Sequence, residues 1–199
     1  EQRFSNDQEL IYSLCHRRFG IGADGLMFLE ESDHSLFTMR YYNSDGREST
    51  MCGNGGRCIA FFAVHLGIVG PNQIFSFEAV DGLHEAEVMQ GPNVSDELPF
   101  PSSASPDGVV NLRMGDVEGV EVLEDGFFLN TGSPHYVRFV DDPGAINVYE
   151  EGRFWRNHQR FAPDGTNVNF VGPVKNDQVM MRTFERGVED ETWSCGTGA

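Results

Sequence analysis

Two short motifs place a cysteine directly before a glycine-rich turn, and both could do acid–base chemistry. Residues 51–58 read MCGNGGRC, and residues 194–199 read SCGTGA. A thiolate can remove a proton, and a thiol can return one. Glycines leave backbone N–H groups open to the close approach of a carboxylate, most of all where a turn opens a helix. Alone, the first motif is equally typical of a glycine-rich turn with an incidental cysteine.

The stretches that precede the two cysteines also repeat. Residues 39–43 read MRYYN and residues 181–185 read MRTFE, with arginine-to-cysteine spacings of 12 and 13 residues. Two copies of a strand, an acidic turn and a Cys-Gly motif indicate an internal duplication. A pseudo-two-fold arrangement of the copies would bring Cys52 and Cys195 face to face across one cleft.

Two opposed thiols suit inversion at a carbon that bears an acidic hydrogen. One sulfur, as thiolate, would remove the proton from one face, and the other, as thiol, would return a proton to the opposite face. The amides of both glycine turns would hold the developing negative charge. A redox pair is less well supported, because its cysteines usually lie close together as C-x-x-C. A zinc site is weaker still, since Cys52 and Cys58 have no histidine at ligand spacing.

A further glycine cluster matches the dinucleotide-binding pattern G-x-G-x-x-G. Residues 20–25 read GIGADG. That fingerprint requires a strand before it and a helix opening within it. Here a helical pattern precedes the cluster and a strand pattern follows, so the glycines predict a tight helix-to-strand connection rather than a nucleotide site.

Hydrophobic periodicity predicts an α+β fold. An N-terminal helix is expected after a capping box formed by Ser5 and Gln8, and a buried helix is expected over Ile59–Leu66. A short helix is predicted over 147–156. Strand patterns cover 26–30, 36–42, 74–80, 84–89, 109–114, 127–130, 136–140, 167–171 and 178–184.

The Pro/Ser-rich stretch 91–108 is the most linker-like part of the chain. It predicts a division into an N-terminal lobe over 1–112, carrying Cys52, and a C-terminal lobe over 113–199, carrying Cys195.

Composition excludes several classes of partner and cofactor. The 199 residues hold 14 Lys and Arg against 31 Asp and Glu, a net charge of −17 that argues against nucleic acid. No apolar run approaches the roughly 20 residues needed to cross a bilayer. The single lysine, Lys175, lies in a turn-like stretch, a poor place for a Schiff base with pyridoxal phosphate. Four cysteines are too few for a disulfide scaffold, which favours a reducing cytoplasm.

Motifs through nearly the whole chain resemble the diaminopimelate epimerase family, whose members are amino-acid epimerases that work without pyridoxal phosphate. The resemblance rests on residues 20–25, 43–46, 51–58, 132–135, 166–170, 185–187 and 195–199. It implies two pseudo-symmetric lobes, each a curved, mostly antiparallel sheet around a central helix, with the active site in the cleft between them. It further implies conversion of LL-2,6-diaminopimelate to the meso form in lysine and peptidoglycan precursor synthesis. No cofactor or metal is implied, and a homodimer is expected.

The resemblance also assigns roles to individual residues. It implies that Cys52 and Cys195 are the two acid–base residues. The residues implied to bind the reacting carboxylate are Gly53, Asn54, Gly196 and Thr197. Those implied to hold the amino and distal groups of the substrate are Asn43, Asn167, Glu185 and Arg186. His135 and Glu185 are implied to tune the thiols.

The chain departs from the family pattern at several points. Ser133 stands where the family commonly has asparagine, and Gly25 where some members carry a substrate-contacting glutamine. The family's N-terminal strand and the helix that follows its second cysteine are expected to be missing from this chain. Two alternatives therefore stay open. One is a cysteine-pair racemase of the proline or hydroxyproline type, although those usually have histidine where Asn54 stands. The other is a catalytically inactive protein that binds a diaminopimelate-like ligand.

Overall fold

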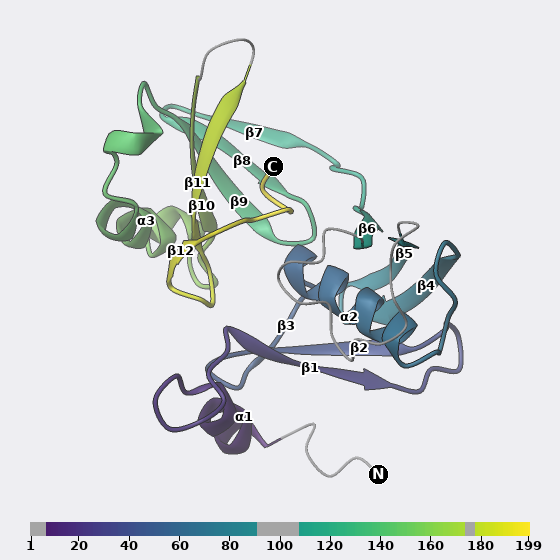
Figure 1. Ribbon diagram of the computed structural model, residues 1–199. Coiled ribbons are helices and arrows are strands. Elements are labelled where there is room, and N and C mark those ends of the chain that lie inside the picture. Colours follow the sequence, from purple (N-terminus) through teal and green to yellow (C-terminus); the bar gives the residue numbers. More distant parts are fainter. Residues whose placement is uncertain (1–6, 91–107, 174–177) are drawn as a thin grey trace. The chain divides into compact units, whose positions relative to one another are not determined.

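A computed structural model describes residues 7–90, 108–173 and 178–199 (Figure 1). Lys175 and the predicted linker, apart from Gly108, lie outside the described residues. Contacts divide the described chain into two compact units. The first comprises residues 27–42, 48–90 and 108–114, and the second comprises 7–26, 43–47, 115–173 and 178–199. The second unit thus includes two N-terminal segments; the predicted division at residue 112 stays a prediction.

The first unit is a six-stranded sheet with one helix against it. Its strands follow the order β1-β2-β4-β5-β6, with β3 paired to β2. Strands β2 and β4 run parallel, whereas β2 and β3, β4 and β5, and β5 and β6 pair antiparallel. The elements are β1 (Gly25–Glu30), β2 (Thr38–Asn43), β3 (Glu48–Ser49), α2 (Gly53–His65), β4 (Ile74–Ala79), β5 (Gly82–Gln90) and β6 (Gly108–Arg113). Helix α2 packs on β5 and β6 and buries Ile59, Ala60 and Ala63 against Phe77 and Val88.

Helix α2 begins at Gly53, so the prediction of a helix starting at Ile59 was wrong at its N-terminus. Glycine has low helix propensity, so the sequence of this first turn does not indicate a helix. Packing explains it. A Cβ at Gly55 would lie 3.1 Å from the Met27 sulfur, and one at Gly56 would lie 2.9 Å from Leu112. The glycines therefore let the start of α2 approach the sheet closely.

The second unit has a six-stranded sheet in the order β12-β11-β10-β9-β8-β7, in which only β9 and β10 run parallel. Its strands are β7 (Val120–Leu123), β8 (Gly126–Asn130), β9 (Pro134–Phe139), β10 (Asn167–Pro173), β11 (Val179–Glu185) and β12 (Asp190–Thr192). Helix α3 (Val148–Arg156) packs on β10, β11 and β12 (Figure 1). Gly152 makes this approach possible, because a Cβ there would lie 2.3 Å from Phe184.

Short 3-10 turns lie on either side of α3, at Pro143–Ala145 and Gln159–Phe161. The apolar core of this unit consists of Tyr136, Val148, Phe161, Val168, Phe170 and Phe184.

Helix α1 (Gln8–Cys15) belongs to the second unit. Its N-cap is Asp7, whose carboxylate accepts a hydrogen bond from the Leu10 N–H at 2.9 Å, so the predicted cap at Ser5 was wrong. The glycine cluster 20–25 lies between α1 and β1. Backbone N–H groups of Ile21 and Gly22 donate to the Leu14 carbonyl, and Gly22 has a φ of +83°. This is the tight helix-to-strand connection that the order of the patterns predicts.

The α+β prediction is confirmed, with a largely antiparallel sheet and a packed helix in each unit. The strand patterns agree with the observed strands to within a few residues. The strands missed by sequence were β3, β7 and β12, which are short and largely exposed, so their hydrophobic signal is weak.

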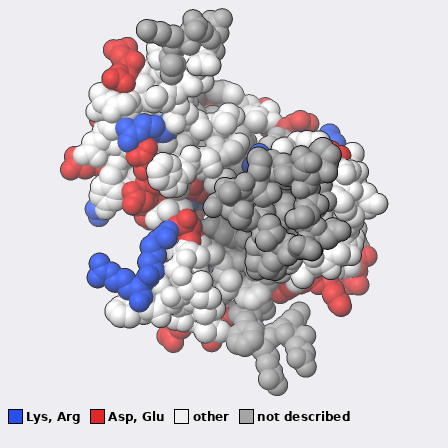
Figure 2. All heavy atoms as spheres, viewed as in Figure 1, with Lys and Arg blue, Asp and Glu red and all other residues white. Residues whose placement is uncertain are grey.

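Acidic side chains are spread over the face in view, and basic ones form small groups (Figure 2). Within the described residues, each helix is too short or too polar to span a membrane.

Candidate active site

Cys195 lies in a tight, buried turn after β12. Its side chain is 7% exposed, and the Gly198 N–H donates to the Cys195 carbonyl at 3.1 Å. The Cys195 sulfur is 3.5 Å from the Thr197 hydroxyl oxygen. Burial raises the pKa of this thiol. The Thr197 hydroxyl and the amides of Thr197 and Gly198 oppose that effect by stabilising the thiolate, whereas the charge of Glu185 adds to it. The turn thus offers polar hydrogens to the sulfur anion.

His135, in β9, is fully buried behind this turn. Its Nε2 lies 3.0 Å from the Thr197 hydroxyl oxygen, and its Nδ1 lies 2.9 Å from the Asn169 amide nitrogen. Burial lowers the pKa of His135 to about 4, and the charge of Arg186 adds to the shift. The imidazole is therefore neutral near pH 7, and it reaches the Cys195 sulfur through Thr197.

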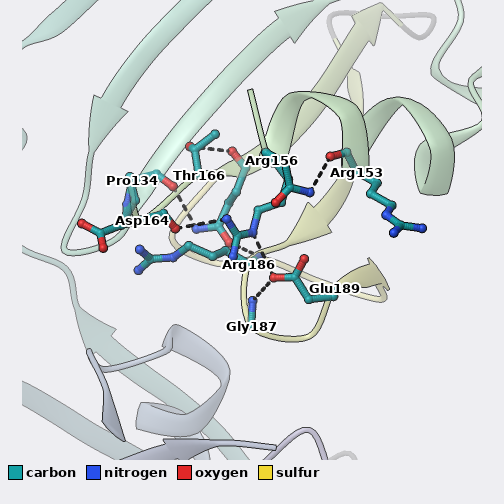
Figure 3. Close-up of polar contacts among 10 residues, drawn as sticks. Pro134, Arg153, Arg156, Asp164, Thr166, Arg186, Gly187 and Glu189 are labelled. Carbon is teal, nitrogen blue, oxygen red and sulfur yellow. Dashed lines mark hydrogen bonds and ion pairs between the residues drawn. The ribbon is translucent and has the colours of Figure 1, made fainter. Parts of the chain in front are cut away.

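Asn167, at the start of β10, ties three parts of the second unit together. Its amide nitrogen donates to the Ser133 hydroxyl at 2.8 Å and to the Pro134 carbonyl at 2.9 Å. Its amide oxygen accepts from the Arg186 N–H at 2.8 Å (Figure 3). Ser133, which replaces the family's usual asparagine, therefore keeps a polar contact. Both amide hydrogens of Asn167 are engaged. Its Oδ1 accepts one hydrogen bond and has a second lone pair, so it can also accept from a ligand.

The turn after β11 holds Arg186 in a defined place. Within this turn, Glu189 accepts from the Gly187 N–H at 3.0 Å and from Arg156 Nε at 2.9 Å. Arg156 also donates to the Asp164 carbonyl at 3.1 Å (Figure 3). Burial lowers the pKa of Arg186, and neighbouring Arg156 adds to this, but the group remains cationic at neutral pH. Among the described residues, none forms an ion pair with the Arg186 guanidinium, so its charge is available to an anion.

Asn43 and Glu185 belong to the same unit as Cys195. Gly187 has a φ of +96°, and a Cβ there would lie 2.8 Å from the Asn43 amide nitrogen. Asn43 thus lies against the turn that carries Arg186. Glu185 ends β11 opposite Asp190, and its carbonyl accepts from the Glu189 N–H at 2.8 Å. The second unit therefore contains seven of the predicted site residues besides Cys195: Asn43, His135, Asn167, Glu185, Arg186, Gly196 and Thr197.

Cys52 is the N-cap residue of α2 in the first unit, closer to the helix than the predicted start at Ile59 placed it. Its backbone is extended, its carbonyl accepts from the Gly56 N–H at 2.7 Å, and its side chain is half-buried. Gly53 is buried and Asn54 is exposed in the first helical turn, where backbone N–H groups lack intrahelical acceptors and favour anions. The preceding residue is held in place, since Asp81 accepts from the Met51 N–H at 3.1 Å.

The two cysteine turns are preceded by matching hairpins. In the β2–β3 hairpin, Tyr42 pairs with Glu48, and Glu48 accepts from Arg40 at 2.8 and 2.9 Å. In the β11–β12 hairpin, Phe184 pairs with Glu191, and Glu191 accepts from Arg182 at 2.7 Å twice.

Each glutamate precedes its cysteine by four residues. The same two-point ion pair in the same register supports the duplication predicted from sequence. The two arginines of this repeat were recognised in the sequence, but the two glutamates were not.

Several polar residues near Cys195 were missed by the sequence reading. Asn169 and Thr183 are 0% and 2% exposed, and Thr131 donates to the Thr197 carbonyl at 2.8 Å. The signal for Asn169 was its place between Val168 and Phe170, because a polar residue on the inward face of a buried strand needs a polar partner. Among the described residues, no group of three or more His, Cys, Asp or Glu gathers to hold a metal ion, and metal independence stays a prediction.

Comparison with known proteins decides the family. The family model described as diaminopimelate epimerase matches residues 1–94 and 127–199. The chain belongs to the diaminopimelate epimerase family. It is 47% identical over 190 residues to the diaminopimelate epimerase of Flavobacterium psychrophilum, covering 96% of this chain and 67% of that protein. It is 42% identical over 202 residues to that of Aquifex aeolicus, covering 100% of this chain and 69% of that protein. The family is one of isomerases, and the chain spans about two thirds of the length of these relatives.

Solved structures of other proteins share the fold of this family member. A phenazine biosynthesis protein of the PhzF family from Bacillus anthracis superposes with a TM-score of 0.62 at 12% identity, covering 88% of this chain and 63% of that one. A hydroxyproline epimerase from Agrobacterium vitis superposes with a TM-score of 0.59 at 16% identity, covering 86% and 56%. At these identities the likeness is one of fold.

Proposed function

We propose that this chain forms the catalytic part of a diaminopimelate epimerase, which converts LL-2,6-diaminopimelate to the meso form without a cofactor. The observation that carries the proposal is the buried Cys195 turn, where a hydroxyl and two backbone amides surround a thiol and a neutral histidine lies behind them. The matched turn at Cys52 and membership of the family support it.

In the proposed reaction the two thiols act from opposite faces of the α-carbon. One cysteine, as thiolate, takes the α-proton and becomes a thiol. The other gives its proton to the opposite face and becomes a thiolate, so protons and charge balance over the turnover. Gly53, Asn54, Gly196 and Thr197 would hold the reacting carboxylate through their turns, and the same amides would stabilise the carbanionic intermediate.

The remaining polar groups suit the far end of a zwitterionic substrate. The guanidinium of Arg186, which has no ion-pair partner within the described part of the chain, provides a cation for the distal carboxylate. Asn43 and the Oδ1 of Asn167 both lie against the turn that carries Arg186, and they would accept from an ammonium group together with the carboxylate of Glu185. The cleft between two lobes, a homodimer, a cytoplasmic location and a role in lysine and peptidoglycan precursor synthesis belong to this proposal as predictions.

Deuterium exchange tests the proposal with the complete protein. LL-Diaminopimelate in D₂O should gain α-deuterium and epimerise, and Cys52→Ser or Cys195→Ser should abolish epimerisation. Cys58→Ser, which changes an exposed thiol on α2, is the matched control and should retain full activity. Epimerisation at the wild-type rate in either active-site variant would contradict the two-thiol mechanism. Exchange with proline alone would favour the racemase alternative, and tight binding with no exchange would favour the inactive binding protein.

A further inference from the structure

A chain of buried hydrogen bonds runs from β11 to the sulfur of Cys195. The Thr183 hydroxyl donates to Asn169 Oδ1 at 2.8 Å. The Asn169 amide nitrogen lies 2.9 Å from His135 Nδ1, and His135 Nε2 lies 3.0 Å from the Thr197 hydroxyl oxygen. That oxygen is 3.5 Å from the Cys195 sulfur. Each link is at hydrogen-bonding distance, so the chain is continuous.

We propose that Asn169, anchored by Thr183, is a positioning residue that keeps the proton of neutral His135 on Nε2 and so directs the Thr197 hydroxyl proton toward the Cys195 sulfur. This inference rests on the proposed function for the role of Cys195. It adds a residue outside the acid–base pair that stabilises the Cys195 thiolate.

The polarity of the chain follows from its donors and acceptors. An Asn169 amide that accepts from Thr183 through Oδ1 presents its N–H to His135, so Nδ1 must be the bare, accepting nitrogen. The proton of the neutral ring then lies on Nε2 and is donated to the Thr197 oxygen. With its oxygen accepting from His135, the Thr197 hydroxyl has its own proton free to donate to the sulfur. In this polarity every donor points toward Cys195 and stabilises its thiolate.

Strand register places the anchor. Asn169 and Thr183 are directly opposed in the antiparallel pair β10–β11, and His135 lies on the parallel neighbour β9. Their exposed fractions are 0% for Asn169 and His135 and 2% for Thr183. Water therefore cannot easily replace a lost hydrogen-bond partner. If the Asn169 amide were reversed or lost its hydrogen bond to Thr183, the tautomer of the His135 ring would change.

The cysteine turn lies directly on this amide–imidazole pair. A Cβ at Gly198 would lie 2.6 Å from Asn169 Oδ1 and 2.9 Å from His135 Nδ1. Two charged groups influence the chain electrostatically. Arg186, after β11, disfavours a positive charge on His135, and Glu185, at the end of β11, disfavours the Cys195 thiolate. Besides burial, the charge of Glu185 raises the pKa of Cys195. The neutral His135 ring, held by Asn169, opposes this by directing a hydrogen-bond donor toward the sulfur.

The tautomer of His135 in the wild-type protein tests the first half of the proposal, and one variant serves only to assign its signals. Long-range ¹H–¹⁵N NMR spectra near pH 7, with the His135 signals assigned by their loss in His135→Gln, should show Nε2 protonated and Nδ1 bare. A ring protonated on Nδ1, or on both nitrogens, would overturn the proposal.

Thr183→Val tests the anchor, because it removes the hydroxyl and keeps the side-chain shape. We expect loss of the single Nε2–H tautomer and a rise of about one unit in the pKa of Cys195, a factor of about ten in thiolate population. The pKa is read from the pH dependence of iodoacetamide labelling, with Cys195 followed by peptide mass spectrometry. The kcat should fall about tenfold with KM changed less than about twofold. Thr183→Ser, which restores the hydroxyl, should recover all of these values.

Thr192→Val is the matched control, since Thr192 pairs with Thr183 across β11–β12 but lies outside the chain of hydrogen bonds to Cys195. It should leave the tautomer and the labelling profile unchanged. A Thr183→Val protein with the wild-type tautomer and Cys195 pKa would overturn the proposal. Neither readout needs turnover, so absence of epimerisation in the wild type would refute the proposed function and leave this test intact.

Discussion

The imidazole of His135 and the hydroxyl of Thr197 form a buried contact of 3.0 Å, and this contact joins the core of the second sheet to the turn of Cys195. The two residues are far apart in sequence, and their side chains are 0% and 9% exposed. Cys195 therefore does not meet an imidazole directly, because a threonine hydroxyl stands between them.

Thr197→Val should lower kcat by roughly 10- to 100-fold, because a hydrogen bond to a charged sulfur is lost and the Nε2–H of His135 is left without its acceptor. The acid limb of the pH–rate profile should move to higher pH as the pKa of Cys195 rises. Steady-state rates in both reaction directions measure this. Thr197→Ser is the control that keeps the hydroxyl, and a Thr197→Val enzyme with wild-type kcat would contradict the contact's role.

His135 should make the protein less stable as pH falls. Its pKa is lowered from about 6.5 when unfolded to about 4 when folded, so the unfolded chain binds the proton more readily. Stability is full above about pH 6.5 and declines toward pH 4, by about 3 kcal/mol in total from this residue. Urea unfolding at a series of pH values measures the slope. His135→Gln should lose this part of the dependence, and an unchanged slope would show that other groups produce it.

Gly198→Ala should disable the enzyme, since the added methyl group would lie 2.6 Å from Asn169 Oδ1 and 2.9 Å from His135 Nδ1. The turn must move away from the ring, and we expect at least a roughly 100-fold loss of kcat/KM from this misplacement. Gly119→Ala serves as control, because a Cβ at Gly119 would have nothing within 4 Å. Equal activity of the two variants would argue against close packing of the turn on His135.

Arg186→Gln should raise KM for diaminopimelate by roughly 10- to 100-fold while the folded structure persists, because a charged hydrogen bond to carboxylate is worth about 1.5–3 kcal/mol. Arg153→Gln is the control, since Arg153 lies in α3 and outside the turn that carries Arg186 (Figure 3). Initial rates over a range of substrate concentrations separate KM from kcat. A normal KM in Arg186→Gln would remove this residue from substrate binding.

Arg182→Gln should destabilise the protein more than Arg40→Gln. Both variants lose a two-point bond to glutamate, but Arg182 also donates to the carbonyls of Pro143 and Ile146, each at 2.9 Å. We expect a loss of about 2 kcal/mol for Arg182→Gln and about 1 kcal/mol for Arg40→Gln. Chemical denaturation measures both. A larger loss for Arg40→Gln would contradict this ranking of the two hairpins.

Local patterns sufficed for most of the secondary structure. Strand-like residue patterns predicted β4, β8, β9 and β10, and helical periodicity predicted α3. The start of α2 and the cap of α1 were wrong. The first turn of α2 depends on close packing rather than on propensity, since a Cβ at Gly56 would lie 2.9 Å from Leu112 of β6. In α1 the carboxylate of Asp7, two residues after Ser5, takes the capping position.

For the site, the sequence by itself determined the two Cys-Gly turns, their matching approaches and the resemblance that assigns Asn43, His135, Asn167 and Arg186. Those signals are contiguous, so a short motif carries them. Only the tertiary structure decided that Thr183, Asn169 and His135 form one line of hydrogen bonds to Thr197. These residues come from β11, β10, β9 and the C-terminal turn, and no spacing along the chain encodes their contact. Strand register brings them together, and burial then makes the polarity of each hydrogen bond matter.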